Sequence, residues 1–205
     1  MPLSKQERFD AMCREAAVCT LCPDLADKQA VLSDLNGPLR PRVLFVAEAP
    51  GRQGADRTRR PFYGDKSGEN FQRLLDSIGL TRDEIFITNA VMCSPRTETD
   101  ANRKPTRTEI KTCSSWLQRT FELIDPRVVA TLGGVALDAI KAIEPHGLML
   151  KFDAGQPVNW NGRTLLPLYH PSPQVIAAQR GLDLQLEHFG RLGRLIGVVP
   201  GRTVT

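Results

Sequence analysis

The sequence contains no long hydrophobic run, and no stretch approaches the roughly 18 apolar residues that a membrane-spanning helix needs. Residues 1–6 lack the features of a secretory signal. A chain of 205 residues is long enough to bury one core and short for two. We therefore expect a single cytoplasmic domain over residues 1–205 that is monomeric and makes no membrane contact. Residues 1–41 would form an arm, and residues 198–205 a frayed tail.

The sequence also lacks a strong excess of charge of one sign. A net charge of +4 permits contact with a polyanion without arguing for it. Arginines cluster in two stretches, residues 52–60 and 96–107. Such runs are often only solvated loops. Here both stretches flank loops expected to border a cleft, so they are also candidates for phosphate contact.

Cysteine is scarce and odd in number. The five residues are Cys13, Cys19, Cys22, Cys93 and Cys113. An odd count argues against a disulfide framework. Cys19 and Cys22 form a C-x-x-C pair after a short predicted helix, whereas a redox pair would normally open a helix beside a strand. Cys93 and Cys113 can supply a second pair. Four thiolates would suit zinc or a [4Fe–4S] cluster, and composition does not choose between them. Cys13 would be the spare thiol, and five unrelated thiols are the alternative.

Apolar runs and helical spacing alternate along the chain. Strands are predicted at 42–48, 85–89, 128–132 and 164–168. Helices are predicted at about 4–17, 68–79, 106–124, 134–143 and 174–196. This alternation predicts an α/β fold, a three-layer sandwich with a four-stranded, mainly parallel central sheet and helices on both faces. Residues 148–160 are candidates for short strands before a turn at Asn161-Gly162.

Polar side chains follow three of the predicted strands where each strand ends, namely Glu48, Asn89 and His170. Because the carboxyl ends of parallel strands share one edge of the sheet, we expect these side chains in one pocket. An amide can read a nucleobase edge, since it donates and accepts side by side. A neutral imidazole suits a developing oxyanion. Taken singly, the Asn is explained as a turn residue and the His as a structural one.

Two further loops border the same edge. Phe62 follows the first predicted strand by a polar loop and offers a flat apolar surface, although a core position would explain it equally well. Ser172 lies between Pro171 and Pro173 before a helix, where a hydroxyl and backbone N–H groups make a natural phosphate seat. An ordinary helix cap is the alternative.

Together these motifs resemble those of the uracil-DNA glycosylase superfamily, and the cysteine pattern is most similar to its family 4, iron–sulfur type. The resemblance runs from about Cys19 to Arg180. Its motifs are Ala47-Glu48-Ala49-Pro50-Gly51, Pro61-Phe62-Tyr63-Gly64, Ile87-Thr88-Asn89, Cys93, Cys113, Leu132-Gly133 and Tyr169-His170-Pro171-Ser172-Pro173.

The resemblance implies a monofunctional DNA glycosylase of base excision repair, which flips a deaminated base, hydrolyses its N-glycosidic bond and leaves an abasic site. Its partner would be DNA that contains uracil or another deaminated base. Phe62 would stack on uracil, Asn89 would read its polar edge, and His170 would stabilise the leaving base. The implied base-binding residues are Glu48, Ala49, Gly51, Phe62, Asn89 and His170. The implied DNA-binding residues are Pro171, Ser172, Pro173 and Gln174.

The sequence departs from the better-known uracil-DNA glycosylases at the residue that would activate water. Ala49 stands where the resemblance to those enzymes implies an Asp, so we expect Glu48 or Asp56 to position the water. Gly51 stands where a tyrosine would exclude thymine. Residues 97–100 look like an insertion between Cys93 and Cys113.

The resemblance also implies a structural [4Fe–4S] cluster held by Cys19, Cys22, Cys93 and Cys113, with zinc as the alternative. Two other functions stay open at this point. One is a glycosylase for hypoxanthine or xanthine, and the other is a catalytically inactive DNA-binding iron–sulfur module.

Overall fold

The computed structural model describes residues 2–178 and 181–198, so the expected frayed tail lies, beyond residue 198, outside the described residues. One five-stranded sheet has the order β2-β1-β3-β5-β4. The strands are β1 Val43–Ala47, β2 Ile85–Asn89, β3 Val128–Leu132, β4 Val158–Trp160 and β5 Arg163–Leu168. All neighbouring pairs are parallel except β4–β5, which is antiparallel. The four predicted strands are thus confirmed as a parallel set.

The prediction of a four-stranded sheet is wrong by one edge strand. Asn161 and Gly162 both have positive φ, as a tight hairpin turn requires, and they fold residues 158–160 back onto β5. Trp160 is only 4% exposed, which gives this short strand its contact with the core. Most of the remaining 148–160 segment is not a strand, because Leu150–Asp153 forms the short helix α5.

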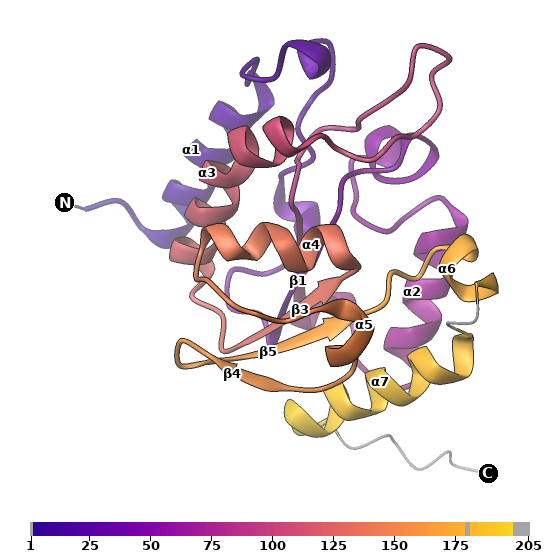
Figure 1. Ribbon diagram of the computed structural model, residues 1–205. Helices are drawn as coiled ribbons and strands as arrows, with labels where there is room; N and C mark the ends of the chain where they lie inside the picture. Colours follow the sequence, from indigo (N-terminus) through magenta and orange to yellow (C-terminus); the bar gives the residue numbers. More distant parts are fainter. Residues whose placement is uncertain (1, 179–180, 199–205) are drawn as a thin grey trace.

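The helices lie on both faces of the sheet (Figure 1). They are α1 Lys5–Ala17, α2 Lys66–Asp76, α3 Arg107–Ile124, α4 Gly134–Ala139, α5, α6 Pro173–Ala177 and α7 Leu182–Leu195. The predicted helix 134–143 ends in a 3-10 turn, Ile140–Ala142, and the predicted helix 174–196 is two helices, α6 and α7. None of the helices in residues 2–178 and 181–198 is long and apolar enough to span a bilayer.

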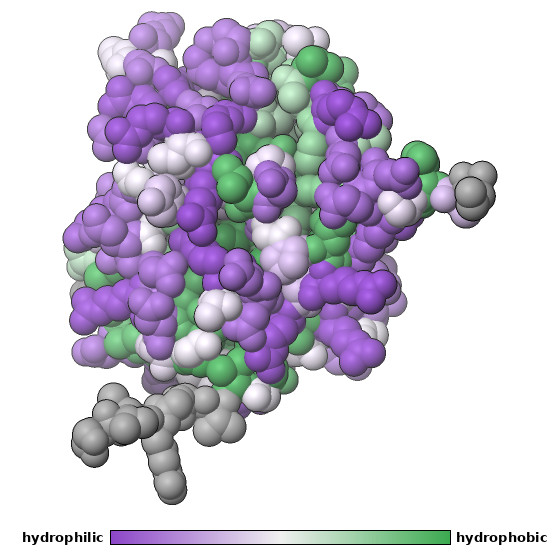
Figure 2. Space-filling view, turned by 180° about the vertical axis from the view of Figure 1, so that it is seen from behind, coloured by the Kyte–Doolittle hydropathy of each residue, from purple (hydrophilic) through white to green (hydrophobic). Residues whose placement is uncertain are grey.

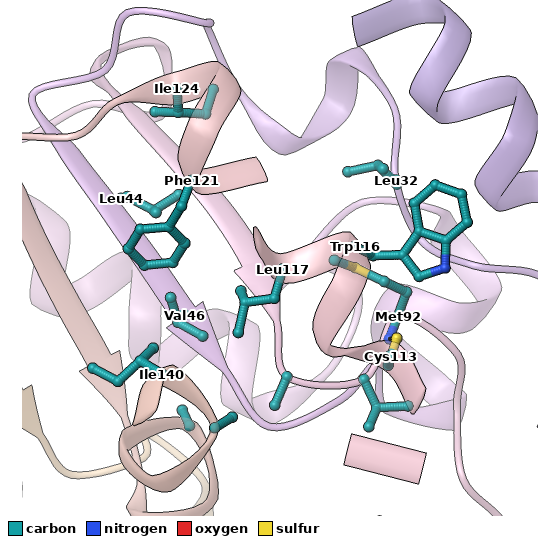
Figure 3. Close-up of a cluster of buried hydrophobic side chains, with 14 of the residues drawn as sticks. Leu32, Leu44, Val46, Met92, Cys113, Trp116, Leu117, Phe121, Ile124 and Ile140 are labelled. Carbon is teal, nitrogen blue, oxygen red and sulfur yellow. Dashed lines mark hydrogen bonds between the residues drawn. The ribbon is translucent and has the colours of Figure 1, made fainter. Parts of the chain in front are cut away.

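Side chains of each central strand alternate between two cores. Leu44 and Val46 of β1 pack with α1, α3 and α4, whereas Phe45 packs with Phe71 of α2 and Phe189 of α7. In the first core, Figure 3 shows Leu117 and Phe121 beside the β1 side chains, and Cys113 and Trp116 nearer the start of α3. Met92, from the segment after β2, lies next to Cys113. Cys113 is therefore part of the first core.

On the outer surface seen from behind, hydrophilic side chains dominate and apolar ones occupy smaller areas between them (Figure 2).

A segment of the arm covers the edge of β2. The Asn36 amide donates to the Ile87 carbonyl at 2.6 Å and accepts from the Ser33 N–H at 2.8 Å. Gly37 has a φ of 129°, and a Cβ there would lie 2.0 Å from the Ile85 carbonyl oxygen. An uncovered edge would leave strand carbonyls open to pairing with another chain. Asn36 and Gly37 close this edge, and only glycine fits so close to the strand.

We expect Asn36→Ala to lower the free energy of unfolding by about 1–3 kcal/mol, since it leaves a buried carbonyl and a half-buried N–H without partners. Denaturant unfolding measures this. The control is Gln156→Ala just before β4, an exposed position without a side-chain hydrogen bond among the described residues, where the change should stay within about 0.5 kcal/mol. Equal losses in both variants would show that the arm does not protect the edge.

Candidate active site

A cleft of about 690 Å³ lies at the carboxyl ends of the parallel strands. Glu48, Asn89 and His170, which follow or end β1, β2 and β5, all line it. The structure therefore brings together the three strand-end residues that the sequence predicted would share a pocket. Gly133 and Gly134, at the start of α4, line the cleft as well.

The register of β1 and β2 fixes the first two of these side chains. Ala47 pairs with Asn89, and the ladder continues past the strands through hydrogen bonds from Ala90 N–H to the Ala47 carbonyl and from Val91 N–H to the Glu48 carbonyl. Asn89 is 4% exposed, and its side-chain nitrogen has no hydrogen-bond partner among the described residues. Buried donors are nearly always paired in folded proteins, so this N–H is available for a ligand in the cleft.

His170 faces the cleft as a neutral donor. Burial of the imidazole lowers its pKa to about 4, so the ring is uncharged near neutral pH. The backbone N–H of Ser172 donates to Nδ1 at 3.1 Å. Since Nδ1 accepts, the single proton of the neutral ring lies on Nε2. His170 therefore has an Nε2–H with which to donate to a bound group.

Phe62 supplies an aromatic wall. Its ring stacks on Phe71 with a centroid distance of 4.6 Å, and it lies 5.6 Å from the His170 ring. The residue lines the cleft although it packs on the second core, so part of its ring is available there. Phe62 is thus both a core residue, on the face of its ring that packs on Phe71, and a cleft residue.

The two predicted catalytic carboxylates occupy different places. Glu48 lines the cleft, where burial raises its pKa and the charge of Lys104, another cleft residue, opposes that rise. Asp56 is not among the residues that line the cleft. Its carboxylate forms an ion pair with Arg96 and a longer one, 3.6 Å, with Arg59. The geometry brings Glu48, and not Asp56, to the other site residues.

Asp65 is a cleft carboxylate that the sequence reasoning missed. It caps α2 by accepting from the Gly68 N–H at 2.8 Å, and it lines the cleft. A Cβ at Gly54 would lie 2.2 Å from its Oδ2, so the preceding loop is shaped to admit this side chain. An Asp at a helix start has an ordinary explanation as a cap, which is why nothing in the sequence marked it.

The predicted DNA-binding segment forms one wall of the cleft. Ser172, Pro173 and Gln174 line it, together with Ala49 and Gly51 from the loop after β1. Pro171 does not line it, because it is buried and its carbonyl accepts from the Asn70 amide at 2.9 Å. Lys66, Arg103 and Lys104 add positive charge at the same cleft.

Residues 97–100 form the end of a hairpin that projects beside the start of α3 (Figure 1). Asp100 forms ion pairs with Arg52 at 3.0 Å and with Arg96 at 2.6 Å. Asn102 accepts from the Arg52 N–H at 2.9 Å. The hairpin thus braces the loop that follows β1.

Four of the five cysteines line one apolar pocket at the end of the first core. Cys19, Cys22, Cys93 and Cys113 share it with Met92 and Trp116, and Cys13 lies outside it. Burial raises the pKa of Cys93 to about 11 and that of Cys113 to about 12. Thiolates in such surroundings need a bound cation, so the donor set fits a thiolate-ligated group. Among the described residues, no three Cys, His, Asp or Glu side chains form a group that would hold a single metal ion.

Comparison with known proteins places these features in a family. A family model described as the uracil DNA glycosylase superfamily matches residues 36–191. The type-4 uracil-DNA glycosylase of Thermotoga maritima is 31% identical to this chain, with 82% of this chain and 84% of the relative covered. The type-5 enzyme of Pyrobaculum aerophilum is also 31% identical, over 80% and 83%. The type-4 enzyme of Archaeoglobus fulgidus is 30% identical, over 93% and 94%. With a cleft that gathers the motifs of that family at one sheet edge, and with these matches over most of its length, the chain belongs to the uracil-DNA glycosylase superfamily.

Proposed function

We propose that this protein is a monofunctional uracil-DNA glycosylase, which hydrolyses the N-glycosidic bond of uracil in DNA and leaves an abasic site. The observation that carries the proposal is the buried, unpartnered amide nitrogen of Asn89 in the same cleft as the neutral imidazole of His170. Membership of the superfamily and relatives named as uracil-DNA glycosylases support it.

Base selection is assigned to Asn89 and Phe62. A flipped uracil would stack on the Phe62 ring and present O4 and N3–H to the amide of Asn89, which donates to the first and accepts from the second. Cytosine would present an amino group where O4 lies in uracil. The Asn89 N–H would then stay buried without a partner, which costs binding free energy.

His170 would stabilise the leaving base. As the N-glycosidic bond breaks, negative charge develops on the uracil oxygens. The Nε2–H of His170 is oriented by the Ser172 N–H and can donate to that charge without transferring its proton. A neutral ring suits this role, because its low pKa keeps it unprotonated over the physiological range.

Glu48 would hold the attacking water. A carboxylate in the cleft can accept a hydrogen bond from water and can favour the positive charge that builds on the sugar. Lys104 keeps Glu48 more readily ionised than burial alone would allow. Asp56 is assigned the bracing of the loop through Arg96, and Asp65 is the second carboxylate within the cleft.

DNA would reach the cleft across Ser172, Pro173 and Gln174. The Gln174 backbone N–H and the Ser172 hydroxyl suit phosphate oxygens, and Lys66 and Lys104 add charge that attracts the strand. Such contacts position the duplex, while the pocket recovers the few kcal/mol that base flipping costs.

Cys19, Cys22, Cys93 and Cys113 would hold a [4Fe–4S] cluster. Each cysteine of such a cluster binds a different iron, so the sulfurs surround the cube, whereas four zinc ligands must converge on one ion. The four thiols line one apolar pocket, which supports a thiolate-bound group, and the resemblance of the cysteine pattern to the family 4, iron–sulfur type favours the cluster over zinc. When bound, the cluster supplies iron–thiolate bonds that would link the arm to the segment after β2 and to α3.

We expect the wild-type protein to release uracil from oligonucleotides with a single uracil, single-stranded or opposite G or A, as measured by alkaline cleavage of the abasic product. Asn89→Ala and His170→Ala should each lower the single-turnover rate at least ~10²-fold, a typical cost of removing one electrostatic stabiliser. His146→Ala, outside the cleft, is the control and should stay active. Wild-type rates in both site variants would contradict the assignment. If the protein releases hypoxanthine or xanthine from oligonucleotides that contain these bases, and releases no uracil, then its substrate is DNA with that other base.

The pH dependence of excision tests the role of Glu48. Because burial raises its pKa above the ordinary 4.5, activity should be lost as pH falls through a value above 4.5, while His170 stays neutral down to about pH 4. Lys104→Met should move this acid limb to still higher pH. Glu48→Gln should abolish the limb and lower the rate at least ~10²-fold.

Two carboxylate variants serve as controls for Glu48. Asp56→Asn should change the rate only a few-fold, because Asp56 lies outside the cleft. Asp65→Asn retains a good helix cap and tests whether a second carboxylate acts in the cleft. If Glu48→Gln is active and Asp65→Asn is inactive, the role of positioning the water belongs to Asp65 and not to Glu48.

We expect Cys19→Ser and Cys113→Ser to lose bound iron and the brown absorbance of a cluster, because each removes one of the four thiols around the pocket. Iron and zinc content per protein chain, measured on purified samples, provides the readout. Cys13→Ser is the matched control and should keep full iron, since Cys13 lies outside the pocket. Zinc in the wild-type protein, or unchanged iron in Cys19→Ser, would contradict the ligand set.

A further inference from the structure

Phe62 has an unusual backbone conformation for an aromatic residue. Its φ is +49°, in the left-handed region that bulky side chains rarely adopt. Such a conformation persists only when the surroundings hold it, and outliers of this kind gather at functional sites. Because the ring of Phe62 lines the cleft, whatever holds this backbone also sets where the ring lies.

Arg82 binds the two backbone carbonyls that precede and follow the Cα of Phe62. Its Nη1 donates to the Pro61 carbonyl at 2.8 Å and its Nη2 to the Phe62 carbonyl at 2.7 Å. One planar group therefore fixes two consecutive peptide carbonyls. Gly68 leaves room for this arrangement, since a Cβ there would lie 2.5 Å from the Phe62 oxygen.

Arg82 is itself held in one orientation. Its Nε donates to the Gln72 side-chain oxygen at 3.0 Å, and its guanidinium lies 5.3 Å from the centroid of Phe71, the ring on which Phe62 stacks. Within the described residues, no carboxylate forms an ion pair with it. Burial lowers its pKa to about 10, so it stays charged. Arg82 is half-buried, and its three hydrogen bonds all go to neutral oxygens, which suits a role in orienting the backbone.

We propose that Arg82 is a positioning residue that sets the depth and tilt of the Phe62 ring in the base pocket, an inference that rests on the proposed glycosylase function. Arg82 does not line the cleft and touches no base. It acts on binding through the backbone of Pro61 and Phe62 and through its contact with Phe71, and both routes lead to the Phe62 ring. Lysine cannot replace it, because a single ammonium lacks the planar fork that reaches two carbonyls at once.

A double-mutant cycle of Arg82→Lys and Phe62→Ala tests this. The measurements are kcat/KM for excision and inhibition by free uracil. Loss of the stacking surface in Phe62→Ala should weaken uracil inhibition about tenfold, and Arg82→Lys should weaken it about threefold or more. Because Arg82 acts through Phe62, the double variant should bind uracil no more weakly than Phe62→Ala alone.

Arg42→Lys is the matched control. Arg42 also makes two guanidinium hydrogen bonds, one to the Glu84 carboxylate and one to the Ile196 carbonyl, and it lies outside the cleft. It should change the melting temperature without changing uracil inhibition. Gln72→Leu, which removes only the Nε partner of Arg82, is a milder variant should Arg82→Lys fold poorly, and it should weaken uracil inhibition in the same direction.

Two results would overturn the positioning role while leaving the glycosylase function in place. One is an active wild-type protein in which the effects of Arg82→Lys and Phe62→Ala multiply. The other is an unchanged uracil inhibition in Arg82→Lys and Gln72→Leu. A wild-type protein that releases no uracil would overturn the proposed function and this inference with it.

Discussion

β1 hydrogen-bonds to β2 along its whole length and to β3 on its other side, and the position of the site depends on that pairing. Both faces of β1 are buried, so its side chains are divided between two cores and the strand cannot slip without exposing one of them. The fixed register places Ala47 opposite Asn89. The continuing ladder then carries Glu48 to the same edge. The active-site spacing is therefore a consequence of core packing on either side of one strand.

The loops above this edge are fixed by charge more than by apolar contact. Asp56 joins Arg96 and Arg59, and Arg59 also donates to the carbonyls of Gln29 and Ala30 in the arm. The Lys28 carbonyl, also in the arm, lies 4.0 Å from the Cys93 sulfur. A continuous set of contacts thus links the cysteine pocket to the loop after β1.

The sequence predicted those parts of the fold that depend on local pattern. The four parallel strands are largely apolar runs, and the polar residues at the ends of three of them mark the cleft. The sequence predicted β4 only as part of a candidate strand segment, 148–160, and not as a strand of the sheet, because it has only three residues and one of them, Asn159, is exposed. The placement of Asp56 could not be derived, since its partner Arg96 lies forty positions away in the chain. Asp65 and Arg82 have ordinary local explanations, as a helix cap and a charged residue before a strand, and only tertiary contacts reveal what they touch.

The hydrogen bond from Ser172 to His170 has a consequence for how substitutions at this loop would behave. The donor is a backbone N–H, so every residue but proline at position 172 keeps it. Tolerance of side-chain changes at Ser172 would therefore say nothing about how His170 is held. Ser172→Pro alone deletes the donor, and the imidazole could then carry its proton on Nδ1 and present a lone pair to the cleft. The protonation pattern of this site is encoded in the path of the main chain, where a comparison of amino-acid identities would not detect it.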